Sequence, residues 1–254
     1  MLSYSICEFA LSNEELTQYY TDAKANYPLE NFGDLDLIFS VALANRDRFP
    51  SINLTGIRNP RTYLERWVKG YYDAVHNLPS TRIATPKTAC TDPAIRVIVQ
   101  ATQGLSEQEA ETGEVNHNLF MSAENIQGNL LEEYIALKTR AYGFLWCDGN
   151  VLRAVDFCNT TGSLLLQIKN KSNTENSSSS NIREGTTIEK WFRLGTSTRG
   201  GVRFPSYRWD RLNTLINQNR TEGFNLPAPT MNELDYQQFL NRIATLNPNL
   251  ITNH

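Results

Sequence analysis

The sequence has few of the side chains that bind transition metals, with three histidines and four cysteines among 254 residues. No two cysteines have the CxxC spacing of a zinc site, so we expect free thiols, mostly in the core. No apolar run approaches the ~20 residues that span a bilayer, which predicts no contact with a membrane. The first residues lack the basic and apolar segments of a secretion signal, so a cytoplasmic location is expected.

The chain also lacks an overall excess of positive charge, because its net charge is −3. Its distribution is uneven, however. Residues 165–209 contain eight Lys and Arg against three Glu. Binding to phosphate groups depends on such a local excess more than on the total charge. The alternative is a solvated basic face that binds nothing.

The pattern of the first part of the chain predicts a mainly helical region over residues 1–120, which binds DNA, forms a dimer or braces the core. Apolar residues recur at helical spacing, and Pro60 and Pro93 suit first helical turns. The acidic stretch 107–114 is typical of a loop or a hinge. The helices are expected from residue 13, over 35–48, over 60–75 and from residue 92.

From residue 121 the pattern changes, and residues 121–254 are predicted to form one core with closing helices. Within this core, residues 170–210 are the expected recognition segment. A turn signal at residues 148–150 predicts a hairpin. The expected order is a helix over 122–141, strands over 144–147, 151–158 and 163–171, a helix capped by Thr186 or Thr187, a strand over 200–205, and helices over 208–219 and 231–246.

Two of these strands carry the candidate chemistry. Gln167 and Lys169 share one face of their strand because side chains alternate, and the preceding strand could bring Asp156 beside them. Magnesium prefers one or two carboxylates together with water and substrate oxygens. Asp156 would supply the carboxylate, while the Gln167 side chain and the Ile168 carbonyl would be neutral ligands. Lys169 would orient the attacking water in a phosphodiester hydrolysis that depends on the metal.

A second carboxylate is expected from the helix before these strands. Glu124, Glu132 and Glu133 are all candidates, and spacing does not separate Glu132 from Glu133, because both lie at the edge of the apolar side. We favour Glu132. The catalytic set predicted from the sequence is therefore Glu132, Asp156, Gln167 and Lys169.

The order of helix Glu, Asp156 and Gln167-Ile168-Lys169 resembles the PD-(D/E)XK nuclease superfamily, with Gln at a position that is usually acidic. The strings from Ala123 to Ile135 and from Gln167 to Arg193 are similar to type II restriction endonucleases of the SinI type. This resemblance implies an α/β fold, with a restriction-endonuclease-like mixed β-sheet flanked by helices. It also implies a homodimer that uses Mg²⁺, and no other cofactor, to cut double-stranded DNA at a short pseudopalindrome such as GGWCC or GGNCC.

The resemblance further implies that the polar segment after Lys169 faces DNA instead of being the flexible linker that its serine run predicts. Arginine is the commonest reader of guanine in the major groove. Arg183 is the first candidate, followed by Arg199 and Arg203. The expected DNA contacts are Lys171, Asn173, Asn176, Ser177, Ser178, Ser179, Ser180, Arg183, Lys190, Arg193, Arg199 and Arg203.

Two other functions remain open at this point. A repair nuclease or a structure-specific nuclease could have the same fold and the same metal chemistry. A protein that binds DNA without cutting it could have lost activity through the missing acid at Gln167.

Overall fold

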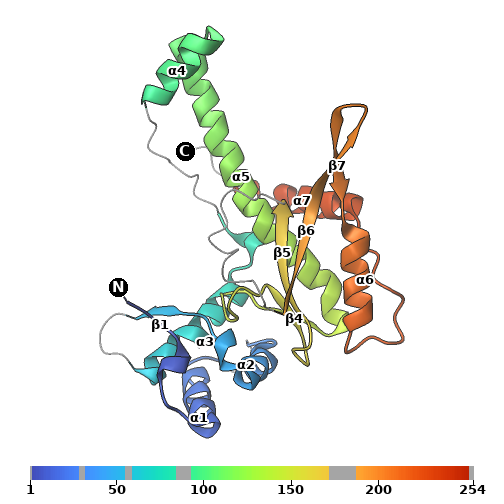
Figure 1. Ribbon diagram of the computed structural model, residues 1–254. Helices are drawn as coiled ribbons and strands as arrows, with labels where there is room; N and C mark the ends of the chain where they lie inside the picture. Colours follow the sequence, from blue (N-terminus) through green and yellow to red (C-terminus); the bar gives the residue numbers. More distant parts are fainter. Residues whose placement is uncertain (1, 29–31, 55–58, 84–92, 172–186, 252–254) are drawn as a thin grey trace.

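The computed structural model describes residues 2–28, 32–54, 59–83, 93–171 and 187–251. Figure 1 shows a group of helices formed by the N-terminal part, a sheet beside it, and one long helix that crosses the molecule. The helices are α1 (Asn13–Lys24), α2 (Leu35–Ala44), α3 (Pro60–His76), α4 (Pro93–Gln103), α5 (Glu107–Thr139), α6 (Trp209–Asn219) and α7 (Glu233–Leu246).

The main sheet has five strands in the order β3-β4-β5-β6-β7. Strands β5 and β6 are parallel, and the other neighbours are antiparallel, so the sheet is mixed. This arrangement confirms the α/β class with a mixed sheet flanked by helices. Its strands are β3 (Phe144–Trp146), β4 (Phe157–Asn159), β5 (Leu165–Lys171), β6 (Ile188–Arg199) and β7 (Val202–Tyr207). A small antiparallel pair, β1 (Leu2–Tyr4) and β2 (Ile52–Leu54), was not expected from the sequence.

A first core joins the N-terminal helices to one side of the sheet. Tyr20 and Phe39 stack with their ring centroids 4.0 Å apart, and Trp67 meets the Tyr20 ring edge-on. The Trp67 indole N–H donates to the Val151 carbonyl over 2.8 Å. Val151 and its neighbour Leu152 are both buried in this core. The chain between β3 and β4 is thus held against α3.

A second core fills the space between the sheet and the helices α5, α6 and α7. Its centre is aromatic, with Trp191 from β6, Trp209 from α6, and Tyr134 from α5. The centroids of the two Trp rings are 5.1 Å apart. Both cores take residues from the strands, so the sheet is covered on two sides. None of the helices in the described part of the chain is long and apolar enough to cross a membrane.

Two expectations about α5 were wrong. The acidic stretch 107–114 is helical, and no new helix begins at Ser122, because α5 runs unbroken from Glu107 to Thr139. Ser106 and Glu109 form a capping box, in which each side chain bonds the other residue's main-chain N–H. At about 1.5 Å per residue, these 33 residues span roughly 50 Å. Helix α5 crosses the expected region boundary at residue 120 without a break.

Two strand and helix assignments were also wrong. The predicted strand over residues 151–158 is mostly a loop, because Val151, Leu152 and Val155 turn into the first core; only Phe157–Asn159 is extended. The turn signal at residues 148–150 therefore lies within a longer connection between β3 and β4. The helix expected after Thr187 is strand β6, which pairs in parallel with β5.

Candidate active site

Asp156 lies directly before β4, where two main-chain hydrogen bonds and one to its carboxylate fix its position. Its N–H donates to the Leu166 carbonyl, and its own carbonyl accepts from Cys147, both over 2.9 Å. The N–H of Ile168 donates to the Asp156 carboxylate over 2.7 Å. The carboxylate is thereby held against β5, next to the two residues that flank Ile168.

Those two flanking residues are Gln167 and Lys169. Gln167 is only 3% exposed, and no described residue forms a hydrogen bond with its side-chain oxygen. A buried polar atom without a partner costs about 1–3 kcal/mol. The Gln167 oxygen therefore suits a ligand that the protein itself does not supply. Lys169, half-buried, is the next residue on the same face of β5.

Helix α5 adds a second carboxylate, that of Glu132. Its side chain accepts a hydrogen bond from the Trp146 indole over 3.3 Å. Burial and the nearby carboxylates of Asp156 and Asp148 raise the pKa of Glu132 to about 8, although Trp146 and Lys169 act in the opposite direction. Two acids that repel each other in a partly buried place favour a bound cation.

The three glutamates that were candidates for the second carboxylate lie in different environments. Glu124 is exposed and pairs with Lys171 over 2.6 Å. Glu133 is buried and accepts hydrogen bonds from the Ser80 hydroxyl over 2.6 Å and from the Ser80 N–H over 2.8 Å. Glu132 is the one whose charge interacts with Asp156.

The donors around Asp156 suit a hard divalent cation. In the described part of the chain, no three His, Cys, Asp or Glu side chains gather closely enough to hold a metal ion by themselves. Glu132 and Asp156 offer two carboxylates, and the unpartnered oxygen of Gln167 offers a neutral ligand. Carboxylate and amide oxygens with room for water are what Mg²⁺ prefers. Ile168 lies between these donors, with its N–H bonded to Asp156.

The expected DNA contacts are distributed over three environments. Lys171 is in the ion pair with Glu124, and Lys190 is half-buried in β6. Arg199 and Arg203 are exposed on the β6–β7 hairpin. The remainder, apart from Arg193, lie outside the described residues: Asn173, Asn176, Ser177, Ser178, Ser179, Ser180 and Arg183.

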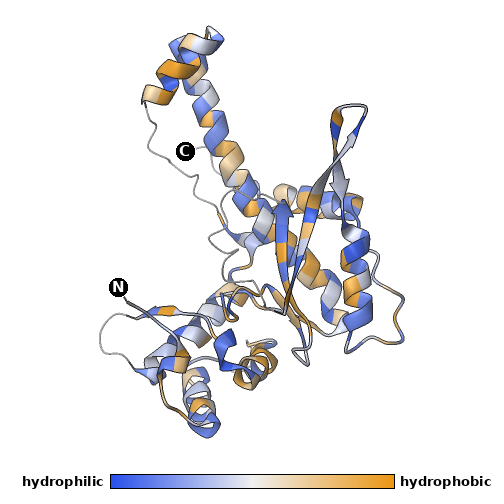
Figure 2. Ribbon diagram, in the orientation of Figure 1, coloured by the Kyte–Doolittle hydropathy of each residue, from blue (hydrophilic) through white to orange (hydrophobic). Residues whose placement is uncertain are grey.

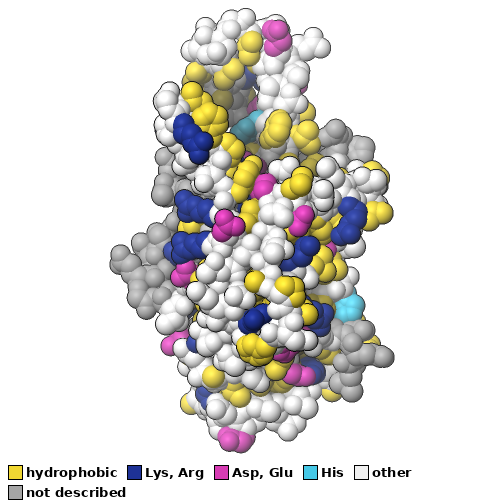
Figure 3. Space-filling view, turned by 90° about the vertical axis from the view of Figure 1, so that its right-hand side faces the viewer, with side chains coloured by type: hydrophobic (Ala, Val, Ile, Leu, Met, Phe, Trp, Pro, Cys, Tyr) yellow, Lys and Arg dark blue, Asp and Glu magenta, His cyan; other side chains and the backbone are white. Residues whose placement is uncertain are grey.

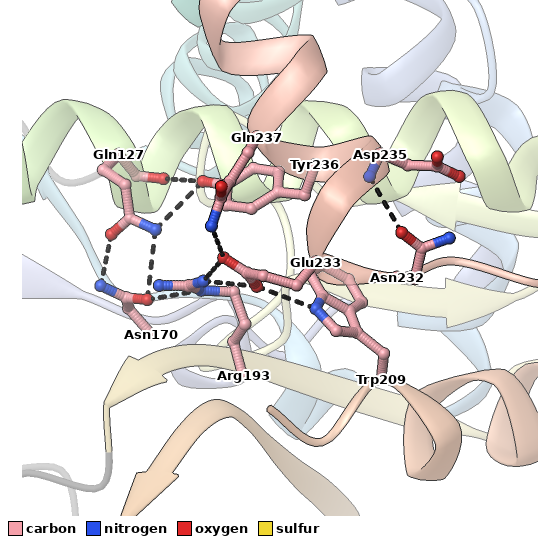
Figure 4. Close-up of polar contacts among 9 residues, drawn as sticks. All are labelled: Gln127, Asn170, Arg193, Trp209, Asn232, Glu233, Asp235, Tyr236 and Gln237. Atoms are coloured by element: carbon pink, nitrogen blue, oxygen red, sulfur yellow. Dashed lines mark hydrogen bonds and ion pairs between the residues drawn. The ribbon is translucent and has the colours of Figure 1, made fainter. Parts of the chain in front are cut away.

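Arg193 differs from the surface residue that the sequence analysis expected. It is only 8% exposed. Its guanidinium donates to both carboxylate oxygens of Glu233 over 2.6 and 2.7 Å, and to the Asn170 side chain over 2.9 Å (Figure 4). It also lies over the Tyr236 ring, 5.3 Å from the centroid. These contacts occupy Arg193 inside the protein, so we do not assign it to DNA.

The contacts of Arg193 belong to a larger network at the end of β5, which the sequence analysis missed. Asn170 and Gln127 bond each other's side chains. The Tyr236 hydroxyl donates to the Gln127 carbonyl over 3.0 Å, and the Trp209 indole donates to Glu233 over the same distance (Figure 4). This network links α5, β5, β6, α6 and α7. Its residues are far apart in the sequence and form no recognisable motif, so only the folded structure shows that they are in contact.

Comparisons with known proteins identify the family of this chain. The family model described as SinI restriction endonuclease matches residues 40–226. The type II restriction enzyme Eco47I of Escherichia coli is 42% identical over 122 residues, which are 46% of this chain and 53% of that enzyme. The type II restriction enzyme SinI of Salmonella infantis is 35% identical over 168 residues, 61% of this chain and 70% of that enzyme. The match thus spans about half the length of Eco47I, and the larger part of SinI. The chain belongs to the SinI restriction endonuclease family.

Proposed function

We propose that this protein is a type II restriction endonuclease, which hydrolyses phosphodiester bonds in both strands of DNA at a specific site. The observation that carries the proposal is the interaction of Glu132 with Asp156, whose carboxylate is bonded to Ile168, next to the unpartnered side-chain oxygen of Gln167 in β5. Such a group of oxygens next to Lys169 is suited to metal-dependent hydrolysis. Its relatives in the family are named type II restriction enzymes, which supports the same activity.

In this mechanism Asp156, Glu132 and Gln167 would hold a Mg²⁺ ion. When bound, the ion lowers the pKa of a water molecule and offsets the negative charge that develops on the phosphate. The hydrogen bond from Ile168 keeps the Asp156 carboxylate pointed at β5. Lys169 orients the attacking water and stabilises the charge on the phosphate. The products are ends with a 5′-phosphate and a 3′-hydroxyl.

The proposed substrate is duplex DNA with a short GGWCC-like or GGNCC-like pseudopalindrome, and the proposed location is the cytoplasm. A pseudopalindrome presents two equivalent half-sites, which a homodimer with two-fold symmetry matches. The exposed apolar residues of α4 and of the first half of α5 support a dimer, because they are not covered within the described chain. They include Ile95, Val97, Ile98, Val115 and Phe120, and the hydropathy colours of Figure 2 show α4 as a largely apolar helix at the end of the α5 arm.

Digestion of a plasmid of known sequence tests the proposal. The purified protein with Mg²⁺ should give discrete fragments, and EDTA should abolish them. Asp156→Ala should leave the plasmid intact while the protein still binds DNA. A ladder without preferred sites would instead indicate a structure-specific nuclease. Intact plasmid at every metal concentration, with DNA binding retained, would indicate a binding protein that lost activity through Gln167.

A further inference from the structure

Strands β6 and β7 form a hairpin that extends beyond the rest of the sheet (Figure 1). Strand β5 pairs with β6 only as far as Leu194, and beyond this residue β6 pairs with β7 up to Arg199. The turn is Gly200-Gly201, with φ values of +56° and +78° that favour glycine. A Cβ atom at either glycine would meet no atom within 4 Å. The tip therefore lies in open solvent.

The part of this hairpin in which β6 and β7 pair, from Leu194 to Tyr207, has two basic residues, Arg199 and Arg203, and no acidic residue. Val202 and Phe204 are 56% and 46% exposed. Figure 3 views the molecule from this side and shows Lys and Arg side chains beside exposed hydrophobic ones. A two-stranded ribbon fits the major groove of DNA, where Arg contacts guanine.

The strand register separates the two faces of the hairpin. Lys169 pairs with Phe192 and Lys171 with Leu194, so every second residue of β6 from Phe192 to Thr198 shares the face of the catalytic lysine. Thr198 pairs with Arg203, which puts Arg203 on this face. Arg199 pairs with Val202 and belongs to the opposite face.

The base of the hairpin is fixed to the core. The Arg193 guanidinium bonds Glu233 on α7, and the Arg193 carbonyl accepts from the Arg208 N–H over 3.0 Å. The Trp191 indole donates to the Arg208 carbonyl over 2.9 Å. Both strands are thus held where they leave the sheet, so the tip keeps a defined position relative to Lys169.

We propose that the β6–β7 hairpin enters the major groove of the DNA substrate and that Arg203, on the catalytic face, reads a guanine. Arg199, on the other face, contributes positive charge towards the phosphate backbone without reading a base. This inference rests on the proposed function and names the element that gives it sequence specificity. The Arg203 guanidinium would donate two hydrogen bonds to guanine O6 and N7.

The test compares Arg203→Ala with Arg199→Ala, a matched change one residue from the same turn. Binding is measured in EDTA with two oligonucleotide duplexes, one containing the site mapped by plasmid digestion and one with that site scrambled. Arg203→Ala should reduce the preference for the specific duplex by roughly 10- to 100-fold. Arg199→Ala should weaken binding to both duplexes alike and leave the preference within about twofold.

Arg203→Lys separates base reading from charge. Lysine keeps the positive charge but lacks the planar pair of donors. We expect the salt dependence of binding to stay as in the wild type while the preference falls. Equal effects of the Ala changes at 199 and 203, or no change of preference for Arg203→Ala, would overturn the inference. If the wild-type protein does not cut at specific sites, the proposed function itself fails. If the wild type cuts and the Arg203→Ala variant cuts equally well, only the inference about Arg203 fails.

Discussion

At the scale of single residues, the charge of Glu132 is the most costly feature of the candidate site. Burial and Asp156 raise the pKa of Glu132 from 4.5 to about 8. An acid whose pKa is higher in the folded state than in the unfolded state destabilises the fold at high pH. The loss of stability develops as the pH rises from the unfolded-state pKa to the folded-state pKa. In EDTA at pH 8, Glu132→Gln should therefore raise the free energy of unfolding, by on the order of 2 kcal/mol. At pH 5 the gain should be small.

Thermal denaturation at the two pH values, with and without Mg²⁺, measures this effect. Glu124→Gln is the control on the same helix, because Glu124 is exposed and its ion pair with Lys171 contributes about 0–1 kcal/mol. Mg²⁺ should stabilise the wild type and have much less effect on Glu132→Gln. A lower melting temperature of Glu132→Gln in EDTA at pH 8 would contradict the proposed electrostatic cost.

Gln167 gives a second prediction at this scale. Gln167→Glu places another carboxylate beside Ile168, whose N–H bonds Asp156, at a position where the amide oxygen has no partner among the described residues. We expect lower stability in EDTA, by roughly 1–3 kcal/mol, and tighter binding of divalent cations. Titration with Mn²⁺ or Mg²⁺, followed by calorimetry, measures the affinity. An unchanged affinity would remove Gln167 from the set of ligands.

What the sequence could predict at this scale depended on the distance between partners. Asp156, Gln167 and Lys169 lie on neighbouring segments, so spacing alone indicated that they come together. Glu133 accepts hydrogen bonds from Ser80, which is 53 residues away in the sequence. A helical wheel shows only residues of the same helix, so it could not predict this contact. The burial of Arg193 was equally invisible, since it depends on Glu233 of α7.

At the scale of elements, the wrong assignments of residues 107–114 and of β6 have different causes. The helix over residues 107–114 had a sequence signal, the Ser106–Glu109 capping box, which the density of acidic residues obscured. Strand β6 had no such local signal. Ile188, Trp191 and Phe192 have helical spacing, but the pairing with β5 and the packing of Trp191 in the second core decide the structure. Tertiary contacts overrode local preference there.

Helix α5 also gives a prediction about stability. Gly128 lies inside this helix, where glycine costs about 0.5–1 kcal/mol relative to alanine. A Cβ atom at this position would meet no atom within 4 Å, and its φ is not positive. Gly128→Ala should therefore raise the free energy of unfolding by about that amount, measured by urea denaturation. A loss of stability would contradict this expectation and show that a methyl group at position 128 collides with a neighbour in the folded protein.

At the scale of the whole molecule, the mixed sheet with flanking helices was expected from the family resemblance, because sequence periodicity did not identify the first half of α5 or strand β6. The way the two cores divide the sheet was not predictable. Val151, Leu152 and Val155 lie in a stretch that the sequence pattern assigned to one strand, yet they bury against the N-terminal helices. That choice depends on the Trp67–Val151 contact between residues 84 positions apart.

The arm formed by α4 and the first half of α5 bears on how two molecules would assemble. No residue of α4 is buried; Ile98 is 60% exposed and Phe120 of α5 is 70% exposed. The one charged residue of α4, Arg96, is already paired with Glu114 over 2.8 Å. The arm therefore offers little to DNA phosphates, and a second copy of the same apolar arm is the partner that suits it.

If the arm is the dimer interface, Ile98→Glu and Phe120→Glu should each convert a dimer into monomers, because an unpaired carboxylate would be buried between the two arms. Sedimentation velocity measures the mass of each variant. Leu246→Glu is the matched control, since Leu246 is 74% exposed and is the last residue of α7, which is not part of the arm. The control should remain dimeric. Monomeric wild type would refute the homodimer, whereas a dimer that resists both arm substitutions would place the interface elsewhere on the molecule.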